Sequence, residues 1–477
     1  MREYDIVIGL EVHAQLLTNT KIFCSCSTRT GLPPNTNTCP VCMGMPGILP
    51  VLNKKVVDYG IKLGLATHCS IAHRNVFARK NYFYPDLPKG YQITQYENPL
   101  CENGCIEIEI DGNVKKIGIT RIHMEEDAGK NIHDEKKPLS YVDFNRAGVP
   151  LLEIVSEPDM NSTAEAVAYL KELRQILMYL EICDGNMEEG SFRCDANVSV
   201  MPKGSKQFGI RTELKNMNSF KNVQKALEYE IERHIGIVES GGRVEQNTML
   251  WNAAENRTYP MRSKEESHDY RYFPEPDLLP LEVDDAWIEE IRSLLPELPS
   301  ARRRRFHRQY GIPEYDADVL TQSKPLADYF EKCTLLLDSP KEISNWIMTE
   351  VLRVLNEHGI DISKLKVTPE MLTDMLSLIK EGTISITMAK DVFSEMALTG
   401  GTAAEIVEAK GLRQVSNEDD LKTMVQDILK NNPAEVTKYR EGKTQLLGFF
   451  VGQLMKATRG TANPKIANKL IKEMLDT

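Results

Sequence analysis

The segment Val149-Pro150-Leu151-Leu152-Glu153-Ile154-Val155 has the composition of a buried β-strand, with one carboxylate in its interior. A short, nearly unbroken apolar run of this kind is typical of a strand inside a packed sheet. An ionised carboxylate there costs several kcal/mol unless a cation or strong hydrogen-bond donors meet it. Glu153 therefore predicts a bound cation or a buried ion pair.

Two further segments bring carboxylates out of strand-like sequence. Residues 6–13 alternate with a period of two, so Glu11 and His13 share the face opposite the apolar side chains. Residues 117–124 lead directly into Glu125, Glu126 and Asp127. Carboxylate oxygens with one imidazole suit a hard divalent ion such as Mg²⁺ or Mn²⁺. The alternative is that these carboxylates form ordinary ion pairs with Arg or Lys.

Four cysteines have the spacing of a second metal site. They form a C-x-C pair and a C-x-x-C pair with twelve residues between them: Cys24, Cys26, Cys39 and Cys42. Two such pairs can supply four thiolates to a tetrahedral zinc ion, and four protein ligands leave no open position for catalysis. The pattern predicts a structural Zn²⁺ site, with four buried free thiols as the alternative.

Two later strands carry polar faces suited to phosphate and metal. Residues 191–200 alternate so that Arg193, Asp195 and Asn197 point one way, and Arg211 and Lys215 align in the next strand. A guanidinium, a carboxylate and an amide on one face are the groups that a phosphate with its metal requires. A half-exposed strand that merely meets water would show the same alternation.

Two basic segments are candidates for contact with nucleic acid or nucleotide. Residues 79–91 place Arg79, Lys80 and Lys89 among aromatic rings that include Tyr82, so rings could stack on a base while cations meet phosphate. Rings that only cover the core are the alternative. Residues 301–308 contain five arginines, which fit a solvated helix face and RNA phosphates equally well.

Composition limits the class of protein. The chain has 477 residues, 41% hydrophobic and 27% charged, which is typical of a globular protein of two to four domains. We expect no transmembrane helix and no signal peptide, and ten cysteines without a secretion signal favour a reducing cytoplasm. The net charge of −11 is uneven, because residues 411–477 have eleven Lys and Arg against eight Asp and Glu.

The patterns predict an α+β fold class with three parts. Residues 1–293 read as a large domain of mixed strands and helices, with a hairpin turning at Asp111-Gly112 and the cysteine insert at 24–42. Prolines between 274 and 299 mark a change, and residues 294–408 read as an all-α domain. Residues 409–477 read as a small, basic, all-α tail suited to contact nucleic-acid phosphates.

Two absences restrict the chemistry. Gly442-Lys443-Thr444 resembles the end of a P-loop, but Thr437 stands where the required glycine would be. The chain also has no Ser-Ser-Lys amidase constellation in a glycine-rich frame and no cysteine in a convincing nucleophilic setting. We therefore expect that it does not hydrolyse glutamine by itself.

Several long motifs resemble the B subunit of the tRNA-dependent amidotransferases. The resemblance covers essentially the whole chain and is carried by residues 7–13, 79–86, 123–130 and 187–195. It implies a ligase that uses ATP to phosphorylate the side-chain carboxylate of Glu-tRNA(Gln) or Asp-tRNA(Asn), and then amidates it with ammonia. It also implies two partners, an amidase (glutaminase) that is the A subunit of the complex, and a small C subunit. A non-catalytic tRNA-binding adaptor is the alternative.

The resemblance also implies roles for single residues. It assigns Mg²⁺ to Glu11, His13, Glu126 and Glu153, with Asp195 as a further catalytic residue, and it selects Glu126 over its neighbour Glu125. ATP or substrate binding would fall to a cationic and polar set: Arg79, Lys80, Tyr82, Lys89, Arg193, Asn197, Arg211 and Lys215. Some members of the family bind zinc through cysteines at 24–42 and others lack them, as expected for a stabilising role.

Overall fold

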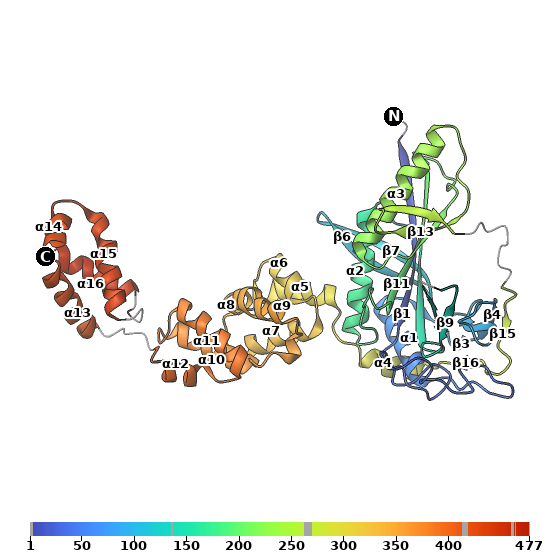
Figure 1. The fold of residues 1–477 in the computed structure, drawn as a ribbon, viewed down its shortest axis with the longest axis horizontal. Helices are drawn as coiled ribbons and strands as arrows, with labels where there is room; N and C mark the ends of the chain where they lie inside the picture. The colour runs from blue at the N-terminus through green and yellow to red at the C-terminus, as the bar shows by residue number, and fades with distance from the viewer. Residues whose placement is uncertain are drawn as a thin grey trace. The chain divides into compact units, whose positions relative to one another are not determined.

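The computed structural model describes residues 3–134, 137–261, 270–412, 418–458, 462 and 464–476 (Figure 1). Contacts divide the chain into two compact units, Met1–Pro299 and Ser300–Thr477. The first is a mixture of strands and helices, and the second is helical in its described residues. The predicted fold class, α+β followed by all-α, is confirmed.

A nine-stranded sheet organises the first unit, and β1 (Tyr4–Gln15) lies in its middle. The order across the sheet is β14 (Arg257–Pro260), β13 (Thr248–Asn252), β12 (Thr212–Lys215), β11 (Phe192–Pro202), β1, β10 (Pro150–Ser156), β7 (Asn113–Glu126), β6 (Cys101–Ile110) and β2 (Ser70–Ile71). All neighbours are antiparallel except β12 and β13. The apolar run around Glu153 is β10, next to the central strand.

The predicted hairpin forms as β6 and β7. Asp111 and Gly112 both adopt positive φ, 51° and 75°, as a two-residue turn that matches the twist of the strands requires. This turn extends β7 to Glu126, so the carboxylates that follow the apolar run are carried on a strand of the sheet.

Helices cover one face of this sheet. The main ones are α1 (Lys54–Ala66), α2 (Thr163–Tyr179) and α3 (Phe220–Glu239), and α4 (Asp285–Ser293) packs on α1. Ser162 and Ser219 cap α2 and α3 by accepting hydrogen bonds from Glu165 and Asn222 amides. The apolar side chains of β1, Ile8, Leu10 and Val12, join the core under these helices. Glu11 and His13 therefore point to the other face.

Smaller strands lie over the other face, opposite α2 in Figure 1. One small sheet joins β15 (Phe273–Pro274), β4 (Phe77–Asn81) and β5 (Tyr91–Gln95), and β5 packs on β7. Two-stranded ladders join β16 (Leu281–Glu282) to β3 (Arg74–Asn75), and β8 (Lys130–His133) to β9 (Ser140–Asp143). The aromatic loop between β4 and β5 is thus held beside the polar face.

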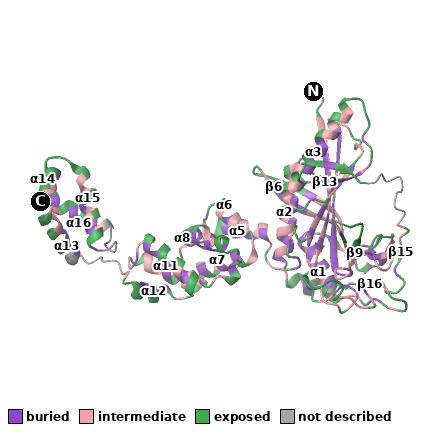
Figure 2. Ribbon diagram, viewed as in Figure 1, coloured by how far each residue is buried: buried purple, intermediate pink, exposed green. Residues whose placement is uncertain are grey.

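The second unit is built from α5 (Pro299–Tyr310), α6 (Glu314–Leu320), α7 (Lys324–Leu336), α8 (Pro340–Trp346), the π-helix η1 (Ile347–Val351), α9 (Leu352–His358), the 3₁₀ turn η2 (Ile362–Lys364), α10 (Pro369–Lys380), α11 (Ile386–Thr399), α12 (Ala403–Lys410), α13 (Glu418–Asn431), α14 (Pro433–Arg440), η3 (Thr444–Leu446), α15 (Leu447–Ala457) and α16 (Pro464–Asp476). It has two separate apolar cores, one from Phe306 to Val407 and one from Leu421 to Leu475. Figure 2 shows the buried residues within each part.

The first unit ends at Pro299, because Leu295 and Leu298 still pack against the core under the sheet. The division of the chain at 293 and 408 stays a prediction. No helix among the described residues is long and apolar enough to cross a membrane.

Candidate functional site

The register of the sheet gathers the polar residues of four strands into one row. Glu153 of β10 lies between His13 of β1 and His123 of β7, and His13 is in turn opposite Arg193 of β11. Residues paired across an antiparallel sheet point to the same face. The buried carboxylate of β10 therefore meets imidazoles from both neighbouring strands.

Three of these side chains converge on one point. Ligand atoms of His13, Glu125 and Glu153 all lie within 4.8 Å of one another. His13 Nε2 is 3.4 Å from Glu153 Oε2 and 3.7 Å from Glu125 Oε1, and His123 Nε2 is 3.1 Å from Glu153 Oε2. Two carboxylates and an imidazole fit a divalent cation of the Mg²⁺ or Mn²⁺ type.

The electrostatics of this cluster favour a cation. Burial opposes the charge of Glu153, but His123 and His13 outweigh it and hold the pKa of that carboxyl well below its usual range. Burial lowers the pKa of His123, but the carboxylates of Glu153 and Glu125 outweigh it and raise that pKa to about 9. The pKa of Glu11 is raised by burial and then by Glu153 and other neighbouring carboxylates. A metal ion would relieve this crowding of negative charge.

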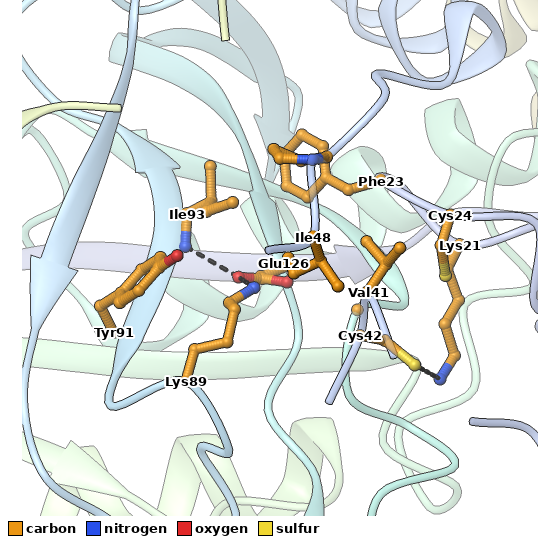
Figure 3. A pocket seen from close by; sticks show the side chains of 12 residues that line it. Lys21, Phe23, Cys24, Val41, Cys42, Ile48, Lys89, Tyr91, Ile93 and Glu126 are labelled. Atoms are coloured by element: carbon orange, nitrogen blue, oxygen red, sulfur yellow. Dashed lines mark hydrogen bonds and ion pairs between the residues drawn. The ribbon is translucent and has the colours of Figure 1, made fainter. Parts of the chain in front are cut away.

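Glu126, which was expected among the metal ligands, does not join the cluster. Its carboxylate pairs with Lys89 and accepts a hydrogen bond from the Ile93 amide at 2.9 Å. The reason is the period of two along β7, which puts Glu125 on the face of His123 and turns Glu126 away. Figure 3 shows Lys89 and Glu126 in contact beside Tyr91.

Asp127 fixes the adjoining edge of the site. It is buried, and its carboxylate lies 3.2 Å from Arg193 Nη2 and 3.5 Å from Arg146 Nε. Burial opposes its charge, but these two guanidinium groups and the Gln15 amide lower the pKa of Asp127. Arg193 is therefore held by Asp127, next to His13 of the neighbouring strand.

A second group of predicted residues surrounds a cavity of about 440 Å³ on the same domain. Glu11, Asn197 and Arg211 line this cavity, and Asn197 Nδ2 donates to Glu11 Oε1 at 3.0 Å. Lys215 pairs with Asp195 and lies 3.0 Å from Glu213 Oε1. Glu11 therefore lines the cavity and also lies near the carboxylates of Glu153, Glu213 and Asp195. The cavity is large enough to hold a small ligand.

Strand β4 carries two cations with different surroundings, Lys80 and Arg79. Carboxylates of Glu125 and Glu153 raise the pKa of Lys80, and the ammonium lies 4.8 Å from the ring of Tyr270. Tyr82 packs against Tyr270 in an edge-on contact. Arg79, expected to bind substrate, instead forms a bidentate pair with Glu275 at 2.8 Å, which fixes the loop.

The four predicted cysteines converge as the second cluster. The sulfur atoms of Cys24, Cys26, Cys39 and Cys42 all lie within 4.8 Å of one another, and Cys42 is buried. A hydrogen bond from Cys24, an amide of Cys39 and the charge of Lys21 lower the pKa of Cys42 to about 4. Four thiols this close together, one of them with a lowered pKa, can supply the four thiolate ligands of a tetrahedral metal site.

The cysteine insert packs beside Lys89 and Glu126. A narrow cavity is lined by Cys24, Cys42, Lys89 and Glu126, as Figure 3 shows. Gly44 has a positive φ of 66°, and a Cβ there would lie 2.4 Å from Lys89 Cγ. Glycine at this position therefore allows the insert to approach Lys89 closely.

The sequence left open whether Glu125 or Glu126 faces the metal, and it gave no role to His123, whose Nε2 lies 3.1 Å from Glu153 Oε2. The period of two could have selected Glu125 and His123, because residues 121, 123 and 125 lie on the same face of the strand. In the arginine-rich helix α5, Arg302 and Arg305 pair with Glu331, and Arg303 pairs with Asp318. At least three of its five arginines therefore have structural partners.

Comparison with known proteins identifies the family of the chain. Residues 6–289 match the GatB/GatE catalytic domain and residues 328–475 match the GatB domain. The chain is 57% identical to the B subunit of the aspartyl/glutamyl-tRNA(Asn/Gln) amidotransferase of Thermodesulfovibrio yellowstonii over 473 residues, 99% of each chain. The same subunit of Thermoanaerobacter pseudethanolicus is 58% identical over 473 residues, again 99% of each. That of Geotalea uraniireducens is 58% identical over 477 residues, 99% of this chain and all of the relative. The chain belongs to the family of amidotransferase B subunits.

Proposed function

We propose that this chain activates and amidates the side-chain carboxylate of Glu-tRNA(Gln), Asp-tRNA(Asn) or both. The observation that carries the proposal is the cluster of His13, Glu125 and Glu153, which lies on the polar face of a domain that matches the GatB/GatE catalytic domain. The reaction is that of a carbon–nitrogen ligase. The γ-phosphoryl group of ATP passes to the carboxylate, and ammonia then displaces phosphate to leave an amide.

The chemistry explains the residues. A carboxylate is a poor electrophile at neutral pH, and phosphorylation gives it a leaving group. A divalent ion held by His13, Glu125 and Glu153, with Glu11 nearby, would neutralise charge on the transferring phosphoryl group. Lys80 brings a positive charge to the same cluster, and Arg193 is oriented by Asp127. These cations would bind the phosphates of ATP and the side-chain carboxylate that is phosphorylated.

The cavity lined by Glu11, Asn197 and Arg211 is our candidate for ATP. It adjoins the metal cluster through Glu11, and Lys215 lies close by on β12, paired with Asp195. Asp195 would then act by fixing Lys215. We keep Arg79 and Glu126 as positioning residues, since Arg79 fixes strand β4, which carries Lys80 and ends just before Tyr82, and Glu126 fixes Lys89.

We also propose that the four-cysteine cluster holds a structural Zn²⁺. The cluster supplies four ligands and leaves no open position, so the ion would stabilise the insert without entering the reaction. The basic tail, with its own core from Leu421 to Leu475, would bind tRNA phosphates.

Ammonia should reach the site from a partner. The chain has no amidase constellation, and unprotonated ammonia is scarce in neutral water, so a shielded source is needed. An amidase in the role of the A subunit, together with a small C subunit, would complete the complex.

ATP consumption tests the proposal. The complex is supplied with Glu-tRNA(Gln), ATP, Mg²⁺ and ammonium but no glutamine, and ADP and Gln-tRNA are measured. We expect ADP and Gln-tRNA in equal amounts, and loss of both when Glu125 and Glu153 are replaced together by glutamine. Gln-tRNA formation without ADP, or no ADP at all from the wild type, would favour a tRNA-binding adaptor.

A further inference from the structure

Lys21 is a fully buried lysine next to the cysteine cluster. Its side chain is 0% exposed, and its Nζ donates to the Asn37 carbonyl at 2.7 Å and the Phe144 carbonyl at 3.4 Å. The same nitrogen lies 3.6 Å from Cys42 Sγ, the contact drawn in Figure 3. The mechanism proposed above gives this buried cation no part.

Charge balance at this position calls for an anion. Among the described residues no carboxylate lies within ion-pair distance of Lys21 Nζ. Two carbonyl groups offset only part of the several kcal/mol that burial of an ammonium costs. Four thiolates around a divalent ion have a net charge of minus two, and Cys42 is the member of that cluster within reach.

We propose that Lys21 is the counter-ion of the metal-bound cysteine cluster and ties the cysteine insert to the segment that leads into β10. The inference rests on the proposed zinc site and adds a positioning residue to it. Outer partners of metal ligands commonly orient the ligand and tune its charge, and here an ammonium does both. The same nitrogen joins Cys42 of the insert to the carbonyl of Phe144, which follows β9.

Gly148 packs against both Lys21 and Cys42. Gly148 has a φ of 85°, and a Cβ there would lie 3.4 Å from Lys21 Cδ and 3.5 Å from Cys42 Cβ. The Lys21 amide donates to the carbonyl of Cys26, which keeps the lysine next to another ligand.

Further hydrogen bonds hold the two residues whose carbonyls accept from Lys21. The Asn37 amide donates to Asn145 Oδ1 at 2.8 Å, and the Phe144 amide donates to Asn35 Oδ1 at 2.8 Å. The asparagines thus join residues 35–37 of the insert to residues 144–145 before β10, and Lys21 adds a further connection between the same two segments.

The test compares metal binding by three variants of the full chain in complex with the amidase and the small C subunit. Lys21→Met removes the charge and the donors, and Lys21→Gln removes the charge but keeps a donor. Lys62→Met is the matched control, because Lys62 also donates to a backbone carbonyl, that of Leu180 at 2.8 Å, in the same domain. Zinc affinity is measured by competition with a chelator, and ligand geometry by the thiolate-to-cobalt absorption of the Co²⁺-loaded protein.

We expect both Lys21 variants to bind zinc about 10–100-fold more weakly than wild type, and Lys62→Met to bind as wild type does. Without metal, Lys21→Met should lose less melting temperature than it loses with zinc bound, because the ammonium then offsets the charge of Cys42 alone and not that of four thiolates. Equal losses of melting temperature with and without zinc, at unchanged zinc affinity, would overturn the proposal and leave Lys21 as a cap for two carbonyls.

Wild-type protein gives a second readout that does not depend on folding of the variants. Removing zinc with a chelator should increase acetylation of Lys21 by an amine-reactive reagent, measured by mass spectrometry, and leave Lys62 unchanged. Equal modification of Lys21 in both states would contradict the counter-ion role. Wild-type protein that binds neither zinc nor cobalt would instead refute the zinc site itself.

Discussion

At the scale of single residues, the partner of Glu153 decides how its substitution should behave. The carboxylate lies between His13 and His123, and no Arg or Lys pairs with it among the described residues. An imidazole can release its proton when its partner is lost, whereas a guanidinium or an ammonium cannot at neutral pH. The cost of removing this carboxylate should therefore be small.

Glu153→Gln should abolish ATP-dependent activation of the aminoacyl-tRNA and weaken Mg²⁺ binding, while the protein stays folded. Thermal melts with and without Mg²⁺, together with single-turnover ATP cleavage, measure both effects. We expect a melting temperature close to wild type without Mg²⁺ and a smaller gain when Mg²⁺ is added. A fall in stability of about 3–5 kcal/mol in both conditions would mean that Glu153 belongs to a structural ion pair.

Glu125 and Glu126 are neighbours with different expected roles, so each is the control for the other. Glu125→Gln should raise the Mn²⁺ dissociation constant severalfold, because its carboxylate lies 3.7 Å from His13 Nε2 in the cluster. Glu126→Gln should leave it near the wild-type value, because that carboxylate pairs with Lys89. Electron paramagnetic resonance of bound Mn²⁺ measures both. The opposite ranking would return Glu126 to the metal site.

At the scale of elements, helix α3 is bound to the sheet by a buried polar network. Glu230 is fully buried and lies 2.7 Å from Arg233 Nη2, 3.4 Å from His234 Nε2 and 2.5 Å from Thr258 Oγ1 of β14. Burial opposes its charge, but these partners lower the pKa of Glu230 to about 2. A lowered carboxyl pKa adds stability above the unfolded-state pKa, and that stability is lost as the pH falls toward the folded-state value.

Glu230→Gln should destabilise α3 and its strand contacts by on the order of 3 kcal/mol at pH 7. The difference from wild type should narrow as the pH falls from about 5 toward 3, because the carboxylate takes up a proton in the unfolded state while it stays ionised in the folded state. Amide hydrogen exchange in α3 and β12–β14 measures the effect locally, and Glu232→Gln, at an exposed position of the same helix, is the control. A difference that does not depend on pH would contradict the charge-based account.

The cysteine insert is the other element whose stability can be tested separately. Cys39→Ser should lower the zinc content and the melting temperature, yet leave ATP cleavage intact in the protein that stays folded, because the cluster has no open position. Elemental analysis and thermal melts measure this, with Cys105→Ser, a half-buried thiol outside the cluster, as the control. Wild-type protein without zinc would refute the site.

At the scale of the whole molecule, the separate cores predict separable tasks. The core from Leu421 to Leu475 is distinct from that of the sheet and from that of the first part of the helical unit. Loss of the tail should therefore leave the catalytic sheet folded.

Removing residues 412–477 should raise the KM for charged tRNA far more than it lowers kcat at saturating tRNA. The tail is the basic part of an acidic chain, and it would contribute binding shared by the ground and transition states. The salt dependence of tRNA binding should also become shallower, while the KM for ATP, the internal control, stays unchanged. An unchanged KM for tRNA with a collapsed kcat would contradict the prediction.

The sequence by itself determined the elements and much of the candidate site. Strand periodicity placed Glu11 and His13 on one face, the Asp111-Gly112 turn defined the hairpin, and the cysteine spacing predicted the second cluster. These are local properties, since side-chain direction and turn geometry depend on neighbours in the chain.

Only the tertiary structure decided which groups meet. Cross-strand register brings His13, Glu153 and His123 together from three separate parts of the sequence. Packing of β5 on β7 brings Lys89 into an ion pair with Glu126. Folding of the insert buries Lys21 against Cys42. Pairings of this kind depend on strand order and on packing between distant segments, and no local pattern encodes them.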